Sequence, residues 1–391
     1  MLIDFSFKNV RSFKNEATLS METGELIEEY AQENTVDIGN ITLVKSAFVF
    51  GGNASGKTNV IRAFQLLRNL VISGTSSDFD LLPTDTYANE GGNVFFKVRF
   101  YKNQKIYIYT IEYNFARIIN ECLRVNGEVI FERNINNVTM PTVIESLVDA
   151  LRDNQPLLYF AQNNNVKEAK EAYEWFSLDI IIPGLLSNTL HSQQLFRPLY
   201  KNTQLTKNVL YFLKAADFNI KDIITEEIIV PVQSDGEKPE PILLVKCVHE
   251  GKNGESFVIN YDAESIGTRI FLLLAMTILE NSHAAKVFLI DEFDRSLHPK
   301  LVKILFRIFN EWNNTHTQLI ATTHNNDVLD YELRTDQIWF VDKDYYGVSR
   351  LDSAFDFNEL KISDIKKNYQ EGVYGADQII NDVLMKNILE L

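Results

Sequence analysis

The sequence predicts an α/β protein that combines a mixed or parallel core sheet with an antiparallel β subdomain and a helical insertion. Three observations lead to this fold class. From Ser265 onward, helical and strand patterns alternate, which is typical of parallel strands connected by helices. Between Val94 and Arg133, four aromatic and β-branched runs are separated by polar turns, as in an antiparallel meander. Between Thr142 and Ser234, helical patterns predominate.

The length and composition of the chain indicate how it is divided. With 391 residues, 45% of them hydrophobic, it can bury a large core in two or three domains. We expect a first lobe over residues 1–140, a helical insertion over 141–235 and a second lobe over 236–391 that ends in a helical tail. The insertion lacks a sustained heptad pattern, which argues against a long coiled-coil arm.

The N-terminal part should contain a hairpin followed by a strand–loop–helix unit. Leu2–Lys8 alternates apolar and polar side chains like a half-buried strand, and Ala17–Met21 is its expected partner. The acidic stretch Glu22–Asn40 predicts a loop. Leu43–Phe50 then predicts a strand, and Asn59–Val71 predicts a helix whose apolar residues share one face.

The remaining elements follow from the same periodicities. Ser73–Gly92 is rich in small polar residues and predicts a loop. The meander strands are expected at Val94–Tyr101, Lys105–Tyr113, Arg117–Val125 and Val129–Arg133. Helices are expected at Thr142–Arg152, Val166–Trp175, Thr206–Ala215, Thr268–Asn281 and from Pro299, and further strands at Ile228–Val232, Ile242–Val248, Ser256–Tyr261, Val287–Ile290, Thr317–Thr323 and from Ile338.

The segment Gly51–Thr58 reads G-G-N-A-S-G-K-T and fits the phosphate-binding pattern G-x-x-x-x-G-K-[ST], the P-loop. Glycines allow the backbone to curl around phosphates, and the N–H groups of the loop and of the helix start point inward. Lys57 supplies a positive charge for the outer phosphates, and the Thr58 hydroxyl suits a magnesium ion. A glycine-rich strand–helix turn without a ligand is disfavoured because strand, loop, lysine and hydroxyl occur together.

Two acidic residues follow the apolar strand Val287–Ile290. Asp291 can hold magnesium opposite Thr58, and Glu292 can orient or deprotonate an attacking water. His324 ends the next predicted strand, where it can hydrogen-bond a terminal phosphate or that water. Taken singly, these residues have plainer interpretations: two solvated acids at a strand end, and a capping or exposed histidine.

Ser265 lies just before the predicted helix Thr268–Asn281 and is a plausible N-cap. A hydroxyl, the Gly267 N–H and a positive helix end also form an anion site. For this segment in isolation, an ordinary capped helix is the better interpretation.

Composition and charge narrow the classes of function. Asp4 and Lys8 interrupt the N-terminal apolar residues, so no signal peptide is expected, and the apolar run Ile270–Leu279 is too short to span a bilayer. Cys122 and Cys247 are far apart without metal-ligand spacing, which favours a reduced, cytoplasmic setting. The net charge of −15 argues against a surface built wholly for nucleic acid and leaves room for a local basic groove.

The order of these motifs resembles that of the ABC-type ATPase heads of the SMC and RecF group, and most of all the RloA-like ATPases of bacterial anti-phage and abortive-infection loci. Asp4–Lys14 is similar to the opening strand and N-x-R-S-F segment of that group, and Asp291–Pro299 to its acidic strand end and following loop. Gln370–Ala376 resembles its C-terminal E-G-x-Y-G-A element. The resemblance covers both ends and the core, and it is weak over Thr142–Ser234.

The resemblance implies a role for each motif. Glu292 is the catalytic base and His324 is the switch histidine. Ser265 and Gly267 belong to the signature segment, which in such heads completes the site of a second copy, and the loop Asp294–His298 crosses between copies. The residues implied to hold ATP are Gly51, Asn53, Ala54, Ser55, Gly56, Lys57, Thr58, Asn59, Ser265, Gly267, His298 and Arg11, with Thr58 and Asp291 at the Mg²⁺ ion.

Two features depart from the pattern of transporter ATPases. Where their signature reads L-S-G-G-Q, the leading leucine is Glu264 here and the first glycine is Ile266, which fits the RloA-like branch. The glutamine of the usual Q-loop has no clear position. Gln162 is a candidate, and a surface polar residue is its better interpretation.

The function implied by the resemblance is an ATP-hydrolysing switch or sensor in antiviral defence. Two copies, as a homodimer or part of a higher oligomer, would sandwich ATP and Mg²⁺ and control a separate effector, for example a TOPRIM-type nuclease, after a phage or nucleic-acid trigger. No membrane partner is expected. The alternative is a RecF-like DNA-binding repair ATPase, which the acidic balance and the lack of a coiled-coil arm disfavour.

Three other interpretations are weaker. The atypical signature and the long insert argue against a transporter subunit. The intact Lys57, Asp291 and Glu292 argue against a structural protein with an inactive nucleotide site. Asp342 and Asp344 form a D-x-D at a predicted strand end, as in a metal-dependent nuclease, and a solvated strand end is the better interpretation.

Overall fold

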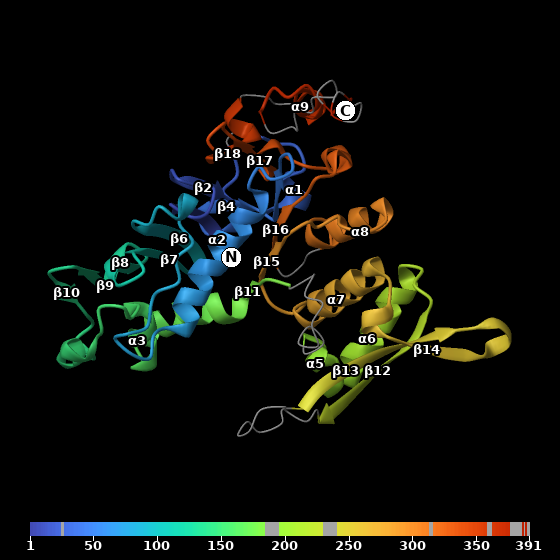
Figure 1. The fold of residues 1–391 in the computed structure, drawn as a ribbon, viewed down its shortest axis with the longest axis horizontal. Helices are drawn as coiled ribbons and strands as arrows, with labels where there is room; N and C mark the ends of the chain where they lie inside the picture. The colour runs from blue at the N-terminus through green and yellow to red at the C-terminus, as the bar shows by residue number, and fades with distance from the viewer. Residues whose placement is uncertain are drawn as a thin grey trace. The chain divides into compact units, whose positions relative to one another are not determined.

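The computed structural model describes residues 1–24, 27–183, 195–229, 241–312, 316–357, 362–375, 385, 386 and 388 (Figure 1). It divides into two compact units, and each is described by itself. The first unit comprises Met1–Ile181, Lys286–Phe293 and Arg307–Leu391, and the second comprises Ile182–Ala285 and Asp294–Phe306. The expected lobes and insertion, with boundaries near residues 140 and 235, stay a prediction about independent domains.

A mixed six-stranded sheet forms the centre of the first unit. Its order is β11 (Ile180–Ile181), β15 (Val287–Ile290), β16 (Gln318–Thr322), β5 (Ser46–Phe50), β17 (Ile338–Lys343) and β18 (Ser349–Ser353). The strands from β11 to β17 are parallel, and β18 returns antiparallel to β17. Every residue of β5, β15 and β16 is buried, as expected for parallel strands covered on both faces. The predicted mixed α/β core is confirmed.

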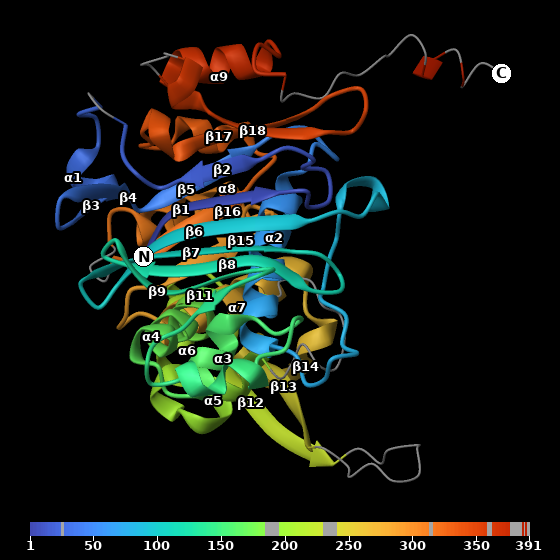
Figure 2. The same ribbon diagram turned by 90° about the vertical axis from the view of Figure 1, so that its left-hand side faces the viewer.

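A seven-stranded antiparallel sheet is the second layer of this unit. The predicted N-terminal hairpin and the predicted meander join in it, because β1 pairs with both β2 and β6, and Figure 2 shows these strands side by side. In β6, buried and partly buried residues alternate, which gives the sheet one inward face. Its order is β10 (Val138–Thr139), β9 (Glu128–Asn134), β8 (Ile118–Val125), β7 (Lys105–Tyr113), β6 (Val94–Lys102), β1 (Leu2–Lys8) and β2 (Ala17–Ser20).

Helix α2 (Lys57–Ser73) covers the antiparallel sheet through the apolar face that its sequence predicts. Phe64 lies 4.5 Å from the ring of Phe5 in β1 and 6.2 Å from that of Trp175. At the mixed sheet, Tyr369 of α9 (Ile362–Gln370) stacks on Phe340 of β17 at 5.4 Å. The contact of Phe64 with Phe5 fixes α2, and therefore the loop that precedes it, relative to β1, and the contact of Tyr369 holds α9 against β17.

Two predicted elements of the N-terminal part were wrong. The expected single strand over residues 43–50 is split at Lys45 into β4 (Ile41–Val44) and β5, which belong to different sheets. Lys45 donates from its ammonium group to the carbonyl oxygens of Glu33 and Asn310, and these bonds hold the chain where it leaves one sheet for the other. The expected loop over residues 22–40 contains helix α1 (Ala31–Asn34) and strand β3 (Thr35–Ile38), the partner of β4.

The helix expected at Thr142–Arg152 was also wrong, since only a 3₁₀ turn forms there, at Glu145–Ala150. Val143, 78% exposed, and the exposed Leu147 find no core to cover, and an amphipathic helix without a packing partner is unstable. Two helices of the first unit follow this turn, α3 (Leu157–Asn163) and α4 (Lys167–Glu174). Helix α4 confirms the helix expected at Val166–Trp175.

The second unit is a three-stranded antiparallel sheet with helices. Its strands are β12 (Ile220–Ile229), β13 (Pro241–Glu250) and β14 (Ser256–Asn260), and its helices are α5 (Arg197–Lys201), α6 (Thr203–Ala215) and α7 (Ile266–Glu280). The strand expected at 228–232 begins earlier, and residues 230–232 lie outside the described residues. Helix α8 (Pro299–Phe309) starts at the proline that the sequence indicated. None of the helices in the described ranges is both long and apolar enough to cross a membrane.

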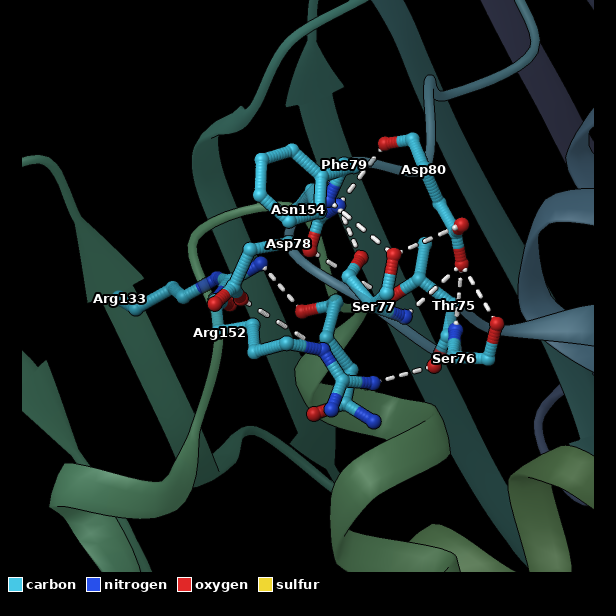
Figure 3. Close-up of polar contacts among 10 residues, drawn as sticks. Thr75, Ser76, Ser77, Asp78, Phe79, Asp80, Arg133, Arg152 and Asn154 are labelled. Carbon is cyan, nitrogen blue, oxygen red and sulfur yellow. Dashed lines mark hydrogen bonds and ion pairs between the residues drawn. The ribbon is translucent and has the colours of Figure 1, made fainter.

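The expected loop between α2 and β6 is held in one shape by polar contacts (Figure 3). The Asp80 carboxylate accepts hydrogen bonds from the N–H and hydroxyl of Ser76, at 2.7 and 2.8 Å, and from those of Ser77, at 2.9 and 3.1 Å. Asn154 donates to the carbonyls of Ser77 and Asp80, and Arg152 donates to that of Thr75. The hydrogen bonds lower the pKa of Asp80 to about 2 because they favour its charged form.

Candidate functional site

Apart from Arg11, the predicted site residues of the first unit follow the carboxyl ends of three neighbouring strands. Because β15, β16 and β5 are adjacent and parallel, their carboxyl ends lie at one edge of the sheet. The chain leaves β5 into the glycine-rich loop, leaves β15 into Asp291 and Glu292, and leaves β16 toward His324. Ligands of open α/β sheets bind at such an edge.

The glycine-rich loop has the backbone that its sequence suggested. Gly56 has a φ of 117°, which favours glycine, and an added Cβ would lie 2.4 Å from the Ser349 hydroxyl and 2.7 Å from the Ser12 hydroxyl. Ala54 also takes a left-handed conformation, with a φ of 61°. Helix α2 begins at Lys57, so the unpaired N–H groups of its first turn face the loop.

Lys57 is 5% exposed and is turned into the loop. Its Nζ donates to the carbonyl oxygens of Gly51 at 2.7 Å and Gly52 at 2.9 Å. The same Nζ lies 3.3 Å from Nδ1 of His324, a residue 267 positions away in the sequence. The fold therefore brings the predicted phosphate-binding lysine and the predicted switch histidine together.

The carboxylate of Asp291 is the centre of a chain of hydrogen bonds. Its Oδ1 accepts from the hydroxyl of Thr58 at 3.0 Å and from that of Thr322 at 2.6 Å. The Thr322 hydroxyl in turn accepts from the backbone N–H of Glu292 at 2.8 Å. Glu292 has a φ of 51°, so a residue with a side chain is held in the left-handed region next to the loop.

The oxygen atoms of this chain fit a magnesium ion. Mg²⁺ prefers hard oxygen ligands and is commonly held by one or two protein oxygens together with substrate phosphates. Thr58 Oγ1 and Asp291 Oδ1, 3.0 Å apart, provide a hydroxyl and a carboxylate on one side of the loop. In the described part of the chain no three His, Cys, Asp or Glu side chains are grouped so that they could hold a metal by themselves.

Three residues that support the loop are not among the site residues predicted from the sequence. The Ser349 hydroxyl donates to the Ser55 carbonyl at 2.5 Å, Lys343 Nζ donates to the Ala54 carbonyl at 2.7 Å, and the Ser12 hydroxyl accepts from Asn59 at 2.7 Å. Ser12 stands in the segment similar to N-x-R-S-F, so that resemblance pointed to it. Lys343 and Ser349 carry no local signal, because only the β17–β18 hairpin brings them to the loop.

The other predicted site residues have surroundings of their own. Arg11 forms an ion pair with Asp85 at 3.0 Å, whereas the next residue, Ser12, accepts a hydrogen bond from Asn59. Asn53 and Ala54 lie exposed at the loop tip, and Ser55 is buried. Ser265, Gly267 and His298 belong to the second unit.

Within the second unit, Ser265 is confirmed as the N-cap of α7, since its hydroxyl accepts from the Thr268 N–H at 3.1 Å. Gly267 approaches the following loop closely: an added Cβ would lie 2.6 Å from the Ser296 carbonyl oxygen. His298 is exposed, and its Nδ1 accepts from the Lys300 N–H at 3.2 Å. Ser265 and Gly267 therefore have structural roles within the second unit, and the Ser265 hydroxyl is also exposed.

The D-x-D segment at Asp342 and Asp344 and the Q-loop candidate Gln162 make contacts close to them in the sequence. Asp344 accepts from the N–H groups of Tyr346 and Val348, both at 2.9 Å, and so stabilises the turn between β17 and β18. Gln162 in α3 donates to the Asn163 side chain at 2.7 Å. The first contact gives the D-x-D segment a turn-forming role, and the second is local to its helix.

Comparison with known proteins adds a family match. The model of a family described as "AAA domain, putative AbiEii toxin, Type IV TA system" matches residues 46–330, most of the chain. The SMC head domain from Thermotoga maritima is 14% identical with a TM-score of 0.42, covering 90% of this chain and 98% of that one. The SmcHead bound to the C-winged helix domain of ScpA is 13% identical with a TM-score of 0.47, covering 90% and 97%. None of the curated proteins compared with the chain matches it.

Proposed function

The chain belongs to the AAA-domain family of the putative AbiEii toxin, Type IV TA system, and on this premise we propose that it is an ATPase acting as a nucleotide-driven switch. One observation carries the proposal: the Lys57 ammonium, the Thr58 hydroxyl and the Asp291 carboxylate meet at the carboxyl edge of the mixed sheet. That combination of a cation, a magnesium-type oxygen pair and a helix N-terminus suits a nucleoside triphosphate.

The roles of the residues follow from their positions. Lys57 binds the outer phosphates, and the loop N–H groups with the start of α2 bind the inner ones. Thr58 and Asp291 hold Mg²⁺, which when bound neutralises negative charge on the phosphate oxygens. Glu292 takes a proton from the attacking water, a contribution of about 10²–10⁴ in rate for a general base. His324, beside Lys57, donates to the terminal phosphate.

We further propose that the Ser265–Gly267 segment completes the site of a second copy, so that two chains close around two ATP molecules. The exposed Ser265 hydroxyl at the start of a 15-residue helix supports this, because an anion can approach it together with the helix N-terminus. ATP then forms part of the interface, and its hydrolysis loosens the dimer or a larger assembly.

A complementation experiment tests the shared site. Lys57→Ala inactivates the phosphate loop, and Ser265→Asp keeps the N-cap of α7 but places a negative charge toward the incoming phosphate. Each variant alone should hydrolyse ATP poorly. Mixed, they should regain activity, because a heterodimer pairs the intact loop of one chain with the intact segment of the other. Ser265→Asn, a neutral cap, is the control and should retain activity.

Equal inactivity of the mixture and of the separate variants would argue for a site completed within one chain. An ATP affinity of Lys57→Ala equal to that of the wild type, measured by calorimetry, would refute the proposal that ATP binds at the phosphate loop. The two results are separable because the first concerns assembly and the second concerns binding.

At the cellular level we propose a cytosolic defence role in which the ATP cycle restrains or releases a separate effector, for which a nuclease is the first candidate. The family description, with its abortive-infection toxin, supports this role. A nuclease that co-purifies with the chain in ATP and dissociates after hydrolysis is the expected partner. Co-purification that ATP leaves unchanged would contradict control by nucleotide.

A further inference from the structure

The second unit contains a pocket of about 380 Å³ between helix α6 and the start of strand β12. Its lining includes Lys207, Tyr211 and Lys214 from the helix and Lys221 from the strand. A volume of this size is within the range of about 300–1,000 Å³ found for small-molecule sites. Every lining residue belongs to the described part of the chain, and none belongs to the ATP site proposed above.

The pocket concentrates positive charge in a protein whose net charge is −15. Lys207, Tyr211 and Lys214 stand at positions i, i+4 and i+7 of α6, so they share one exposed face. Across the described residues, none of the three lysines forms an ion pair within 4.0 Å, and Glu250 is the single carboxylate in the lining. The mutual repulsion of the three ammonium groups would be relieved by an anion.

Aromatic side chains also line the pocket, and neighbouring elements hold part of its lining in place. Phe218 stacks on Phe271 of α7 with ring centroids 4.8 Å apart and an interplanar angle of 13°. Asn219 donates to the Glu250 carbonyl at 3.0 Å, which ties the α6–β12 connection to the end of β13. Tyr211, which also lines the pocket, is 71% exposed and can stack on a planar ligand.

We propose that this pocket binds a nucleoside phosphate, either as a free nucleotide or as part of a single-stranded nucleic acid. The three lysines bind phosphate groups, and Tyr211 stacks on a base. Cationic grooves with exposed aromatic rings bind single strands in this way, with little dependence on sequence. No residue of the phosphate loop lines this pocket, so the inference does not depend on ATP hydrolysis.

The first arm of the test uses a fluorescein-labelled oligothymidine of about 15 nucleotides and the full chain, followed by fluorescence anisotropy. For three phosphate contacts, log K should fall with log salt with a slope of about −2, and Lys214→Ala/Lys221→Ala should reduce the slope to about −0.7. That double variant should bind at least about tenfold more weakly, and Tyr211→Leu at least about fivefold more weakly.

Lys167→Ala/Lys170→Ala on α4 is the matched control, since it removes two exposed lysines and the same net charge from the other unit. It should bind the oligonucleotide like the wild type. An equal loss in both double variants would overturn the proposal in favour of a general charge effect, and a duplex that binds as tightly as the single strand would overturn the stacking role of Tyr211.

The second arm separates the two ligand sources. AMP is titrated calorimetrically into Lys57→Ala, in which the phosphate loop no longer contributes. Binding that is lost on adding Lys214→Ala/Lys221→Ala identifies a free nucleotide as a ligand, whereas binding of the oligonucleotide alone identifies a strand. Binding of neither probe would overturn the proposal. Phosphate release from ATP by the pocket variants should match the wild type.

Discussion

Thr322 is expected to position both acidic residues of the site, although it contacts no phosphate in the proposed mechanism. Its side chain is 0% exposed, and its hydroxyl donates to Asp291 at 2.6 Å while accepting from the Glu292 N–H at 2.8 Å. Thr322→Val keeps the shape of the side chain and removes both bonds. Thr322→Ser keeps the hydroxyl and removes only a methyl group.

The magnitudes of the two substitutions differ. A hydrogen bond to a charged group contributes about 1.5–3 kcal/mol and one between neutral groups about 0.5–1.5 kcal/mol, so Thr322→Val should lower the free energy of unfolding by about 2–4.5 kcal/mol. Thr322→Ser should lower it by about 1 kcal/mol, the value of one buried methyl group.

The kinetic effect should be larger than the effect on ATP binding. The left-handed backbone at Glu292, with a φ of 51°, is held by the Thr322 hydroxyl and by the Phe293 N–H, which donates to the Thr322 carbonyl at 3.0 Å. A misplacement of about 1 Å costs about 10²-fold in rate, so kcat of Thr322→Val should fall by about that factor. ATP affinity should change little, because Lys57 and its loop are untouched.

Urea denaturation and steady-state phosphate release on the two variants measure these effects. The reasoning is refuted if Thr322→Val is as stable as Thr322→Ser, because the hydroxyl would then contribute nothing. A kcat equal to that of the wild type would refute the positioning role even if the stability falls as expected.

Three further outcomes are expected. Glu292→Gln should bind ATP, hydrolyse it at least about 10²-fold more slowly and accumulate as a dimer or higher oligomer, and an ATP-saturated monomer in light scattering would contradict the shared site. The hydrogen bonds from Ser76 and Ser77 lower the pKa of Asp80 to about 2, so this carboxylate contributes stability above about pH 4 that is lost as the pH falls toward 2. The urea midpoints of the wild type and of Asp80→Asn should therefore converge on acidification. A difference that stays constant with pH would disprove this link. Burial raises the pKa of Cys247 to about 12, so iodoacetamide at pH 8 should label it only after unfolding, and rapid labelling of the native protein would show that the thiol is accessible.

The sequence by itself determined the elements whose signals are local. The P-loop pattern, the apolar strand before Asp291 and the strand before His324 are encoded within a few residues of each chemical group, because a parallel strand buried on both faces is a continuous apolar run. Period-two alternation likewise indicated the antiparallel strands. The AAA-domain family match agrees with the relation that the order of these motifs implied.

Only the tertiary structure decided which of these elements meet. The change of sheet at Lys45 depends on the carbonyl of Asn310, and the approach of Ser349 to the phosphate loop depends on a distant hairpin. Residues 142–152 have the apolar spacing of a helix, yet Val143 and Leu147 are exposed and have no partner to pack against. Such contacts join residues that are far apart in the chain, so no local pattern records them. Lys57 and His324 lie together because β5 and β16 are neighbours in the mixed sheet, and this strand order cannot be read from the sequence.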